Sequence, residues 1–365
     1  MTDLVAFRRD LHRHPEVGSH VPRTAAALAG ALEAAGWRVT RGVGGHGILA
    51  SLGTGAGPLL RADMDALPIT EATGLPYASE VPGAFHGCGH DGHTAMLLGA
   101  AEALAADPPP HAVHLMGQPA EEQGTGAQAM IADGLFERVA VTRAWGLHCW
   151  PGAPVGALST RAGPMMAHED NFEIVVEGVG GHASQPHLQA DAMVAGAAIV
   201  AALQTVVART CDPADFAVLS VTGFETDGAR NVVPSRVAIT GDARGYSDAV
   251  RDVVRAASRR VAQGVAASHG CEATVAWDQS FVPLVNDADS VAMATEALDL
   301  DADQPRVGGA EDFAHVLARV PGAFLFLGNG TEGPGALPLH NPGFVFDDRA
   351  VPHGVVALTT LARLG

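Results

Sequence analysis

The spacing of apolar and polar positions predicts strands that alternate with helices in the first part of the chain. Helical spacing with few helix breakers covers residues 2–14 and 23–35, and Gly36 ends the second of these helices. Short apolar runs at 37–40, 47–53 and 58–65 have the length of strands. A helix at 94–106, a strand from 112, a helix at 126–136 and a strand at 143–150 follow. This alternation predicts an α/β fold: a mixed, mostly parallel sheet flanked by helices.

The pattern changes after residue 168. The chain then predicts a strand at 171–179, a helix at 190–209, strands at 216–226 and 236–246, a helix at 248–268 and a strand at 271–279. This βαββαβ order is typical of a ferredoxin-like domain. Helices near 290–300 and 311–320, a strand at 322–330 and a helix after Pro352 resume the α/β pattern. We therefore predict a discontinuous catalytic domain, 1–168 plus 283–365, with an inserted domain at 169–282.

Polar residues whose side chains can act as ligands, acids or bases follow several of the predicted apolar strands. Asp63 and Asp65 end one strand, Glu121 and Glu122 follow another, and His148 ends a third. In open parallel sheets, ligands bind beyond the carboxyl ends of the strands. We therefore expect these side chains to converge.

The densest group of candidate ligands lies in "AFHGCGHDGHTAM", residues 84–96. Cys88 and His90 are separated by one glycine in a loop before a predicted helix. Alone, this run is compatible with a metal site, with a cysteine nucleophile beside a base, or with a polar loop. The adjacent Glu121 and Glu122 favour a metal site, because one carboxylate can bind metal while the other acts as a general base. His340, between two prolines in "LPLHNPGF", is a further candidate ligand.

Composition excludes several other functions. At 365 residues the chain is long enough for two domains, and 47% hydrophobic with 17% charged residues is typical of a soluble globular protein. A net charge of −18 argues against nucleic-acid binding. The chain contains no lysine, which excludes a Walker-type phosphate loop and lysine Schiff-base chemistry.

The sequence also predicts a cytoplasmic location without a membrane anchor. The charged N-terminal stretch lacks the apolar core of a signal peptide. The longest apolar run, from Ala192, is interrupted by Gln204 and predicts a buried or interface helix rather than a membrane span. The four cysteines show no paired spacing, which favours reduced thiols.

The motifs, taken in order, resemble those of a known family. They are "DLHRHPEVG", "RADMDALPI", "HGCGHDGHTAMLLGAA", "QPAEE", "GLHCWP", "GGHASQPH", "NVVPS", "GAEDF" and "LHNPGF", and they run nearly from end to end. The chain resembles the co-catalytic metallo-amidohydrolases that include hippurate hydrolase, indole-acetyl-amino-acid hydrolase and related aminoacylases and carboxypeptidases. This resemblance implies hydrolysis of N-acyl-L-amino acids, which are small-molecule substrates.

The resemblance also implies the composition of the site. The ligands of two divalent metal ions, zinc, manganese or cobalt, are expected to be Cys88, His90, Glu122, His148 and His340. Cys88, as a thiolate, takes the bridging role that an aspartate has in other branches. Glu121 is expected to be the general base that deprotonates the attacking water and then protonates the departing amine.

Residues of the inserted domain resemble those that complete the site in the family. His182 is similar to a histidine that reaches the site of a neighbouring subunit and helps to hold the oxyanion. This predicts a homodimer or a dimer-based oligomer, with the inserted domain as the dimerisation surface. Asn231 and Arg244 match positions that contact the substrate carboxylate, and a guanidinium suits that contact because it can bind a carboxylate bidentately. His187 has no assigned role.

Several alternatives remain open from the residues alone. The same chemistry could serve a dipeptidase or carboxypeptidase, a cysteine hydrolase could use Cys88, and a scaffold could bind metal without catalysis. Asp63 and Asp65 either orient ligands or cap the turn before Pro68, and Asp91 is either part of the site or a helix cap. The segments "EEQGTGA" and "GDARGY" depart from the family pattern, which leaves substrate preference open.

Overall fold

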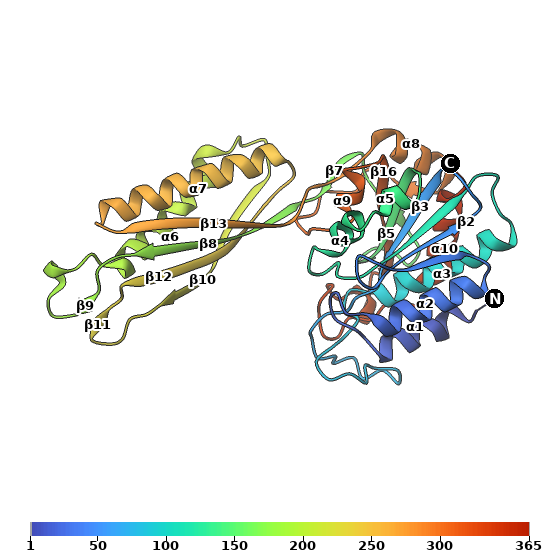
Figure 1. The fold of residues 1–365 in the computed structure, drawn as a ribbon, viewed down its shortest axis with the longest axis horizontal. Coiled ribbons are helices and arrows are strands. Elements are labelled where there is room, and N and C mark those ends of the chain that lie inside the picture. The colour runs from blue at the N-terminus through green and yellow to red at the C-terminus, as the bar shows by residue number, and fades with distance from the viewer. Residues whose placement is uncertain (1, 365) are drawn as a thin grey trace. The chain divides into compact units, whose positions relative to one another are not determined.

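The computed structural model describes residues 2–364, which form two compact units (Figure 1). The first unit comprises residues 2–165, 285–305 and 311–364. The second comprises residues 166–284 and 306–310. The second unit therefore interrupts the first in sequence, and the short segment 306–310 also belongs to the second unit.

The first unit is built on an eight-stranded sheet. Its order is β1 (Arg38–Val43), β2 (Gly47–Leu52), β4 (Val113–Gln118), β3 (Gly57–Asp63), β5 (Val141–Pro151), β16 (Gly322–Gly330), β6 (Leu158–Ser159) and β15 (Leu300–Asp301). The four central strands β4, β3, β5 and β16 run parallel to one another, whereas β2 is antiparallel to both β1 and β4, and β6 is antiparallel to β16. The mixed, mostly parallel sheet predicted from the sequence is confirmed. Every residue of β3, β4 and β16 is buried, as expected for strands covered on both faces.

Helices surround this sheet. They are α1 (Leu4–Arg13), α2 (Pro22–Ala34), α3 (His90–Ala106), α4 (Gly126–Ala132), α5 (Leu135–Arg138), α8 (Ala288–Ala297), α9 (Ala314–Leu317) and α10 (Ala350–Leu361), with a short 3₁₀ helix, η2 (Gly333–Ala336). Helix α3 packs on β3 and β5 and is flanked by α1, α2 and α10 (Figure 1). The helix predicted at 311–320 is wrong in extent, because only the four residues of α9 are α-helical there.

The second unit has the predicted βαββαβ order. Its main elements are β8 (His168–Glu177), α6 (Ala192–Thr210), β10 (Ala217–Thr226), β12 (Arg236–Gly245), α7 (Asp248–Ser268) and β13 (Glu272–Phe281). The antiparallel sheet order β10-β12-β8-β13 is that of a ferredoxin-like fold, which confirms this part of the prediction. Smaller elements are β9 (Gly181–His182), η1 (Pro186–Leu188) and β11 (Val232–Val233). The paired strands β7 (Gly163–Met166) and β14 (Leu284–Asn286) lie at the boundaries between the two units in sequence.

Helix α6 is long and apolar enough to cross a membrane by length and composition alone. Its buried side chains include Ala195, Ile199 and Leu203, which join the apolar core formed with the four-stranded sheet and α7. Asp191 caps the helix by accepting hydrogen bonds from the main-chain N–H groups of Met193 and Val194. The helix is therefore part of the core of its own unit.

A buried network of charges joins α1 to α3. Arg8 Nη1 donates to Asp91 at 2.7 Å, and His12 Nδ1 lies 2.9 Å from the same carboxylate. The other ring nitrogen of His12 lies 3.3 Å from Glu71. Burial opposes the charge on this imidazole, but the hydrogen bonds to Asp91 and Glu71 prevail and raise the pKa of His12 to about 9.

This raised pKa predicts that stability falls in mildly alkaline solution. Protonated His12 contributes fully below its unfolded-state pKa of about 6.5, and the contribution is lost as the pH rises through about 9. The free energy of unfolding should fall by up to ~1.4 kcal/mol per pH unit in this window. Urea unfolding of chelator-treated protein at several pH values measures it. His12→Gln should flatten the curve, and an unchanged curve for this variant contradicts the assignment.

Candidate metal centre

The site lies where three parallel strands end at the same edge of the sheet. Asp63, the last residue of β3, is in register with Gln118, the last residue of β4. Arg61 of β3 is in register with Gly146 of β5, so the two residues that follow in β5 reach the same edge. The geometry therefore gathers the polar residues that follow β3 and β4 and those in the last third of β5.

The five ligands predicted from the sequence converge in the first unit. Cys88 Sγ lies 3.4 Å from His148 Nε2. Glu122 lies between two histidines, with His90 Nε2 at 3.8 Å from one oxygen and His340 Nε2 at 3.4 Å from the other. Donor atoms of Cys88, His90 and Glu122 all lie within 4.8 Å of one another. Segments far apart in sequence thus supply one compact set of donors.

The backbone around these donors adopts unusual conformations. Gly89 has φ +84°, and a Cβ at this position would lie 2.6 Å from the Sγ of Cys149, so only glycine fits between the two predicted ligands of this loop. Among residues 2–364, the non-glycine residues with positive φ are Ala120, at 55°, and His340, at 66°. One precedes the glutamate pair and the other is a predicted ligand. Left-handed conformations of such residues cost energy and concentrate at functional sites.

The donor set fits divalent metal ions. His90 Nδ1 donates to the carbonyl oxygen of Asp65 at 2.9 Å, and His148 Nδ1 donates to that of Cys149 at 2.8 Å. In the neutral ring, which is the ligand form of histidine, the proton is then on Nδ1 and Nε2 is left to bind metal. Nε2 of His90 and Oε1 of Glu122 are buried with no hydrogen-bond partner among the described residues. Imidazole and carboxylate donors beside a thiol are the chemistry of zinc, cobalt and manganese sites.

Glu121 is buried beside this donor set, with 6% of its surface exposed. Its main-chain N–H and that of Glu122 donate to the two carboxylate oxygens of Asp65, at 3.1 and 3.2 Å. Asp65 therefore holds the glutamate pair in place, which decides between its two predicted roles. Burial, with the carboxylates of Glu311 and Glu122 nearby, raises the pKa of Glu121 well above its usual range. A carboxylate of raised pKa is a stronger base.

Sequence reasoning missed the charge network under Glu121. Buried Arg61 donates to Asp63 at 2.7 Å and to Glu311 at 2.6 Å, and lies 3.2 Å from Asp312. The main-chain N–H of Asp312 lies 3.4 Å from Glu121 Oε1. Two features of the sequence could have indicated this network: an arginine within the apolar strand "PLLRAD" and the acid pair of "GAEDF". Because the two segments lie about 250 residues apart, local patterns do not show that they pair.

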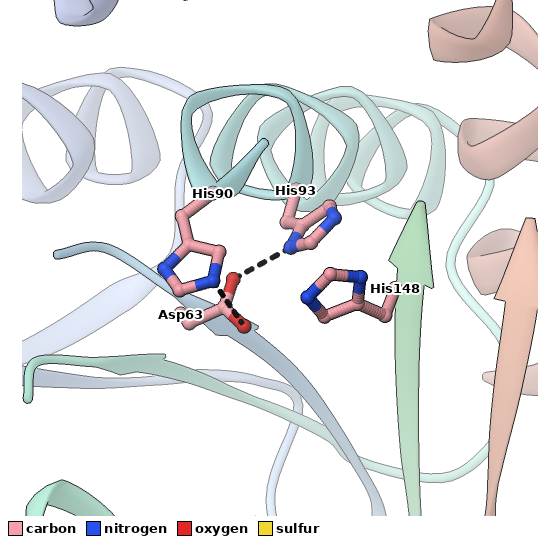
Figure 2. A group of neighbouring side chains, drawn as sticks. All are labelled: Asp63, His90, His93 and His148. Carbon is pink, nitrogen blue, oxygen red and sulfur yellow. Dashed lines mark hydrogen bonds and ion pairs between the residues drawn. The ribbon is translucent and has the colours of Figure 1, made fainter. Parts of the chain in front are cut away.

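Of the two alternatives left open for Asp91, the helix cap is wrong. The helix expected from about Thr94 begins at His90, and its N-cap is Gly89, which makes no side-chain cap. Asp91 lies in the first helical turn, where Arg8 and His12 neutralise it. The earlier start places His90 and His93 one turn apart on α3, beside Asp63 and His148 (Figure 2).

Comparison with known proteins agrees with this geometry. Residues 59–364 match the model of peptidase family M20/M25/M40, which is more than half of the chain. The chain belongs to this family. It is a metal-dependent amidohydrolase or peptidase.

Several relatives of this M20 enzyme have hydrolase names. The N-acetyl-L-cysteine deacetylase of Bacillus subtilis (strain 168) is 37% identical over 358 residues, covering 95% of this chain and 84% of the relative. The IAA-amino acid hydrolase ILR1-like 4 of Arabidopsis thaliana is 34% identical over 379 residues, covering 98% and 84%. A solved Bacillus subtilis structure described as a dinuclear metal binding peptidase from M20 family is 32% identical, with a TM-score of 0.84 and coverage of 99% and 96%.

The remaining predicted residues of this M20 enzyme lie in the second unit. His182 in β9 pairs with Val232 in β11, and the N–H of Ala183 donates to the carbonyl oxygen of Asn231 at 3.1 Å, so His182 and Asn231 lie close together. Arg244 lies near the other end of β12, in ion pairs with carboxylates of that unit. His187 is exposed in η1. The structure thus groups two of these residues and separates Arg244 from them.

Proposed function

We propose that this enzyme hydrolyses the amide bond of N-acyl-L-amino acids at a two-metal centre. The observation that carries the proposal is the convergence of Cys88, His90, Glu122, His148 and His340 beside buried Glu121. A relative named N-acetyl-L-cysteine deacetylase and a solved neighbour described as dinuclear support the substrate class and the number of ions. Bound zinc, manganese or cobalt supplies Lewis acidity, which polarises the amide carbonyl and acidifies water.

The chain's own residues supply proton transfer in this proposal. Glu121, held through its main chain by Asp65, takes a proton from the attacking water and delivers it to the departing amine nitrogen. Its raised pKa suits both steps, because the carboxylate accepts the proton readily and the buried acid then passes it to the amine nitrogen as that group departs. Glu122, the next residue, turns its carboxylate to His90 and His340 instead and serves as a ligand.

Residues of the second unit bind the rest of the substrate in this proposal, from a neighbouring subunit of a homodimer. The main-chain N–H of Ser184 donates to His182 Nδ1 at 3.1 Å, which puts the ring proton on Nε2 and makes that atom a donor for an oxyanion. Asn231 and Arg244 are assigned to the substrate carboxylate. Because Glu169 and Asp242 hold Arg244 at 2.6 and 2.7 Å, a substrate carboxylate must replace one of them.

The four cysteines are free, which supports a cytoplasmic location in this proposal.

A substrate panel tests the proposal. Metal-free enzyme is reconstituted with zinc, manganese or cobalt and assayed on N-acetyl amino acids, longer N-acyl amino acids and free dipeptides, with release of the amino acid as the readout. We expect the highest kcat/KM on N-acyl amino acids, and no turnover after exhaustive chelation. Full activity without metal contradicts the proposal, and faster turnover of free dipeptides favours a dipeptidase.

One observation favours a second candidate function, a cysteine hydrolase. The 3.4 Å distance between Cys88 Sγ and His148 Nε2 is compatible with a nucleophile and its base. However, burial and the nearby Glu122 raise the pKa of the Cys88 thiol, and burial and the nearby His93 lower the pKa of His148. Both shifts favour a neutral pair in the metal-free site, so His148 does not act as a base that generates the thiolate, whereas a bound divalent ion would stabilise that thiolate. We therefore assign Cys88 to metal binding.

A further inference from the structure

His93 lies among the donors but has both ring nitrogens occupied. Its Nδ1 lies 2.7 Å from Asp63 Oδ1, as Figure 2 shows. Its Nε2 accepts the main-chain N–H of Cys149 at 2.9 Å. Because an N–H group donates to Nε2, the ring proton is on Nδ1 and is donated to the Asp63 carboxylate. Neither nitrogen is left to bind metal, although the donor atoms of Asp63, His90, His93 and His148 lie within 4.8 Å of one another.

The hydrogen bonds continue from His93 to a predicted ligand. The carbonyl oxygen of Cys149 accepts the Nδ1 proton of His148 at 2.8 Å, which leaves His148 Nε2 facing Cys88 Sγ. The Sγ of Cys149 also donates to the carbonyl oxygen of Cys88, at 3.3 Å. The main chain at Cys149 therefore connects His93 on α3 with His148 on β5 and with the loop that carries Cys88.

The start of this chain of hydrogen bonds is fixed as well. Asp63 Oδ2 accepts from Arg61 at 2.7 Å while Oδ1 accepts from His93. Asp63, His93 and Arg61 are all buried, with at most 2% of their surface exposed. A buried carboxylate with both oxygens engaged cannot rotate freely, so it holds the His93 ring in one orientation.

We propose that His93 is a positioning residue for metal binding. With Asp63 it holds the main chain at Cys149, and through it the tautomer and ring orientation in which His148 Nε2 binds one of the two ions. The inference rests on the proposed two-metal function, and it assigns a role to a residue that is itself no ligand. It predicts that His93 governs the affinity of the metal position that contains His148, and leaves the other position intact.

Cobalt titration of metal-free protein tests this inference. The number of ions per chain comes from elemental analysis, and the binding steps from the absorption of cobalt bound to the Cys88 thiolate. Wild type should bind two ions. His93→Leu should bind one as tightly as wild type and the other about 10–100-fold more weakly, the usual effect of losing a partner that orients a ligand. His93→Gln should recover most of the affinity, because its amide can donate to Asp63 and accept from Cys149.

Two further variants guard against loss of folding. His93→Asn carries a shorter amide that reaches one partner only, and should lose affinity at the same single position. His114→Leu is a matched control, because His114 is a buried histidine bonded to Ser51 Oγ at 2.9 Å on β4; it should bind both ions normally.

The outcomes separate this inference from the proposed function. Unchanged affinity for both ions in His93→Leu and His93→Asn overturns the inference alone. Equal weakening of both ions in these variants also overturns it, because His93 then supports the whole site. If wild type binds no cobalt, the two-metal proposal fails and the inference fails with it.

Discussion

Glu121→Gln should lower kcat for an N-acyl amino acid by about 10²–10⁴-fold, the usual contribution of a general base, while the metal content stays at the wild-type value. The amide has the shape of the carboxylate but cannot accept the proton of the attacking water. The main-chain contact of Glu121 to Asp65 is unaffected by the substitution, and the amide oxygen of glutamine can still accept from the main-chain N–H of Asp312. Steady-state kinetics and elemental analysis of the same samples measure both quantities, and Glu121→Ala should abolish turnover with the same metal content.

A matched control separates proton transfer from a general loss of charge. Glu177→Gln changes an exposed carboxylate at the end of β8 and should leave kcat unchanged. Retained turnover in Glu121→Gln would contradict the assignment and would direct attention to Glu311, the neighbouring buried carboxylate. Loss of metal together with turnover would instead mean that Glu121 is itself a ligand.

The arrangement of the site could be predicted because parallel strands impose it. Once β3, β4 and β5 are recognised as neighbours, Asp63, Glu121 and His148 have to meet, since the carboxyl ends of such strands share an edge. The inserted unit was also predictable, because its strands are amphipathic and its helix α7 has clear boundaries, from the Ser247 cap to Ser268. These features depend on local periodicity and on the order of strands and helices, both of which can be recognised in the sequence.

Other features depend on contacts that local patterns do not contain. The polar run "HDGH" does not have helical spacing of apolar residues, so it suggested a loop; the structure includes it in α3 because Arg8 and His12 neutralise Asp91 and because Asp63 bonds His93. The four-residue α9 is short because Glu311 and Asp312 turn toward Arg61 instead of continuing a helix. Buried charges override periodicity in both places.

The role of Cys88 has the second large expected effect. Cys88→Ala should lose bound metal and reduce turnover to that of chelated enzyme, because the thiol is the donor placed beside both His148 and Glu122. Cys88→Asp should retain metal and part of the activity, since a carboxylate can take the bridging role that is proposed for the thiolate. Elemental analysis and kinetics on the same N-acyl amino acid measure both effects, with Cys271→Ala, a buried cysteine of the second unit, as the control.

The same variants decide between a ligand and a nucleophile. A nucleophilic Cys88 predicts that Cys88→Ala keeps its metal, that Cys88→Asp is inactive, and that rapid mixing with substrate gives a burst of amine and an acyl group on the thiol. A metal ligand predicts the opposite for each, because the aspartate restores the bridge and no covalent adduct forms. An acyl-Cys88 adduct in the mass spectrum of quenched wild-type enzyme would therefore overturn the two-metal proposal even if metal were bound. If Cys88→Asp is active and keeps its metal, Cys88 is not a nucleophile. An aspartate at this position could not replace a thiolate in acyl transfer and still leave the activity dependent on metal in the same way.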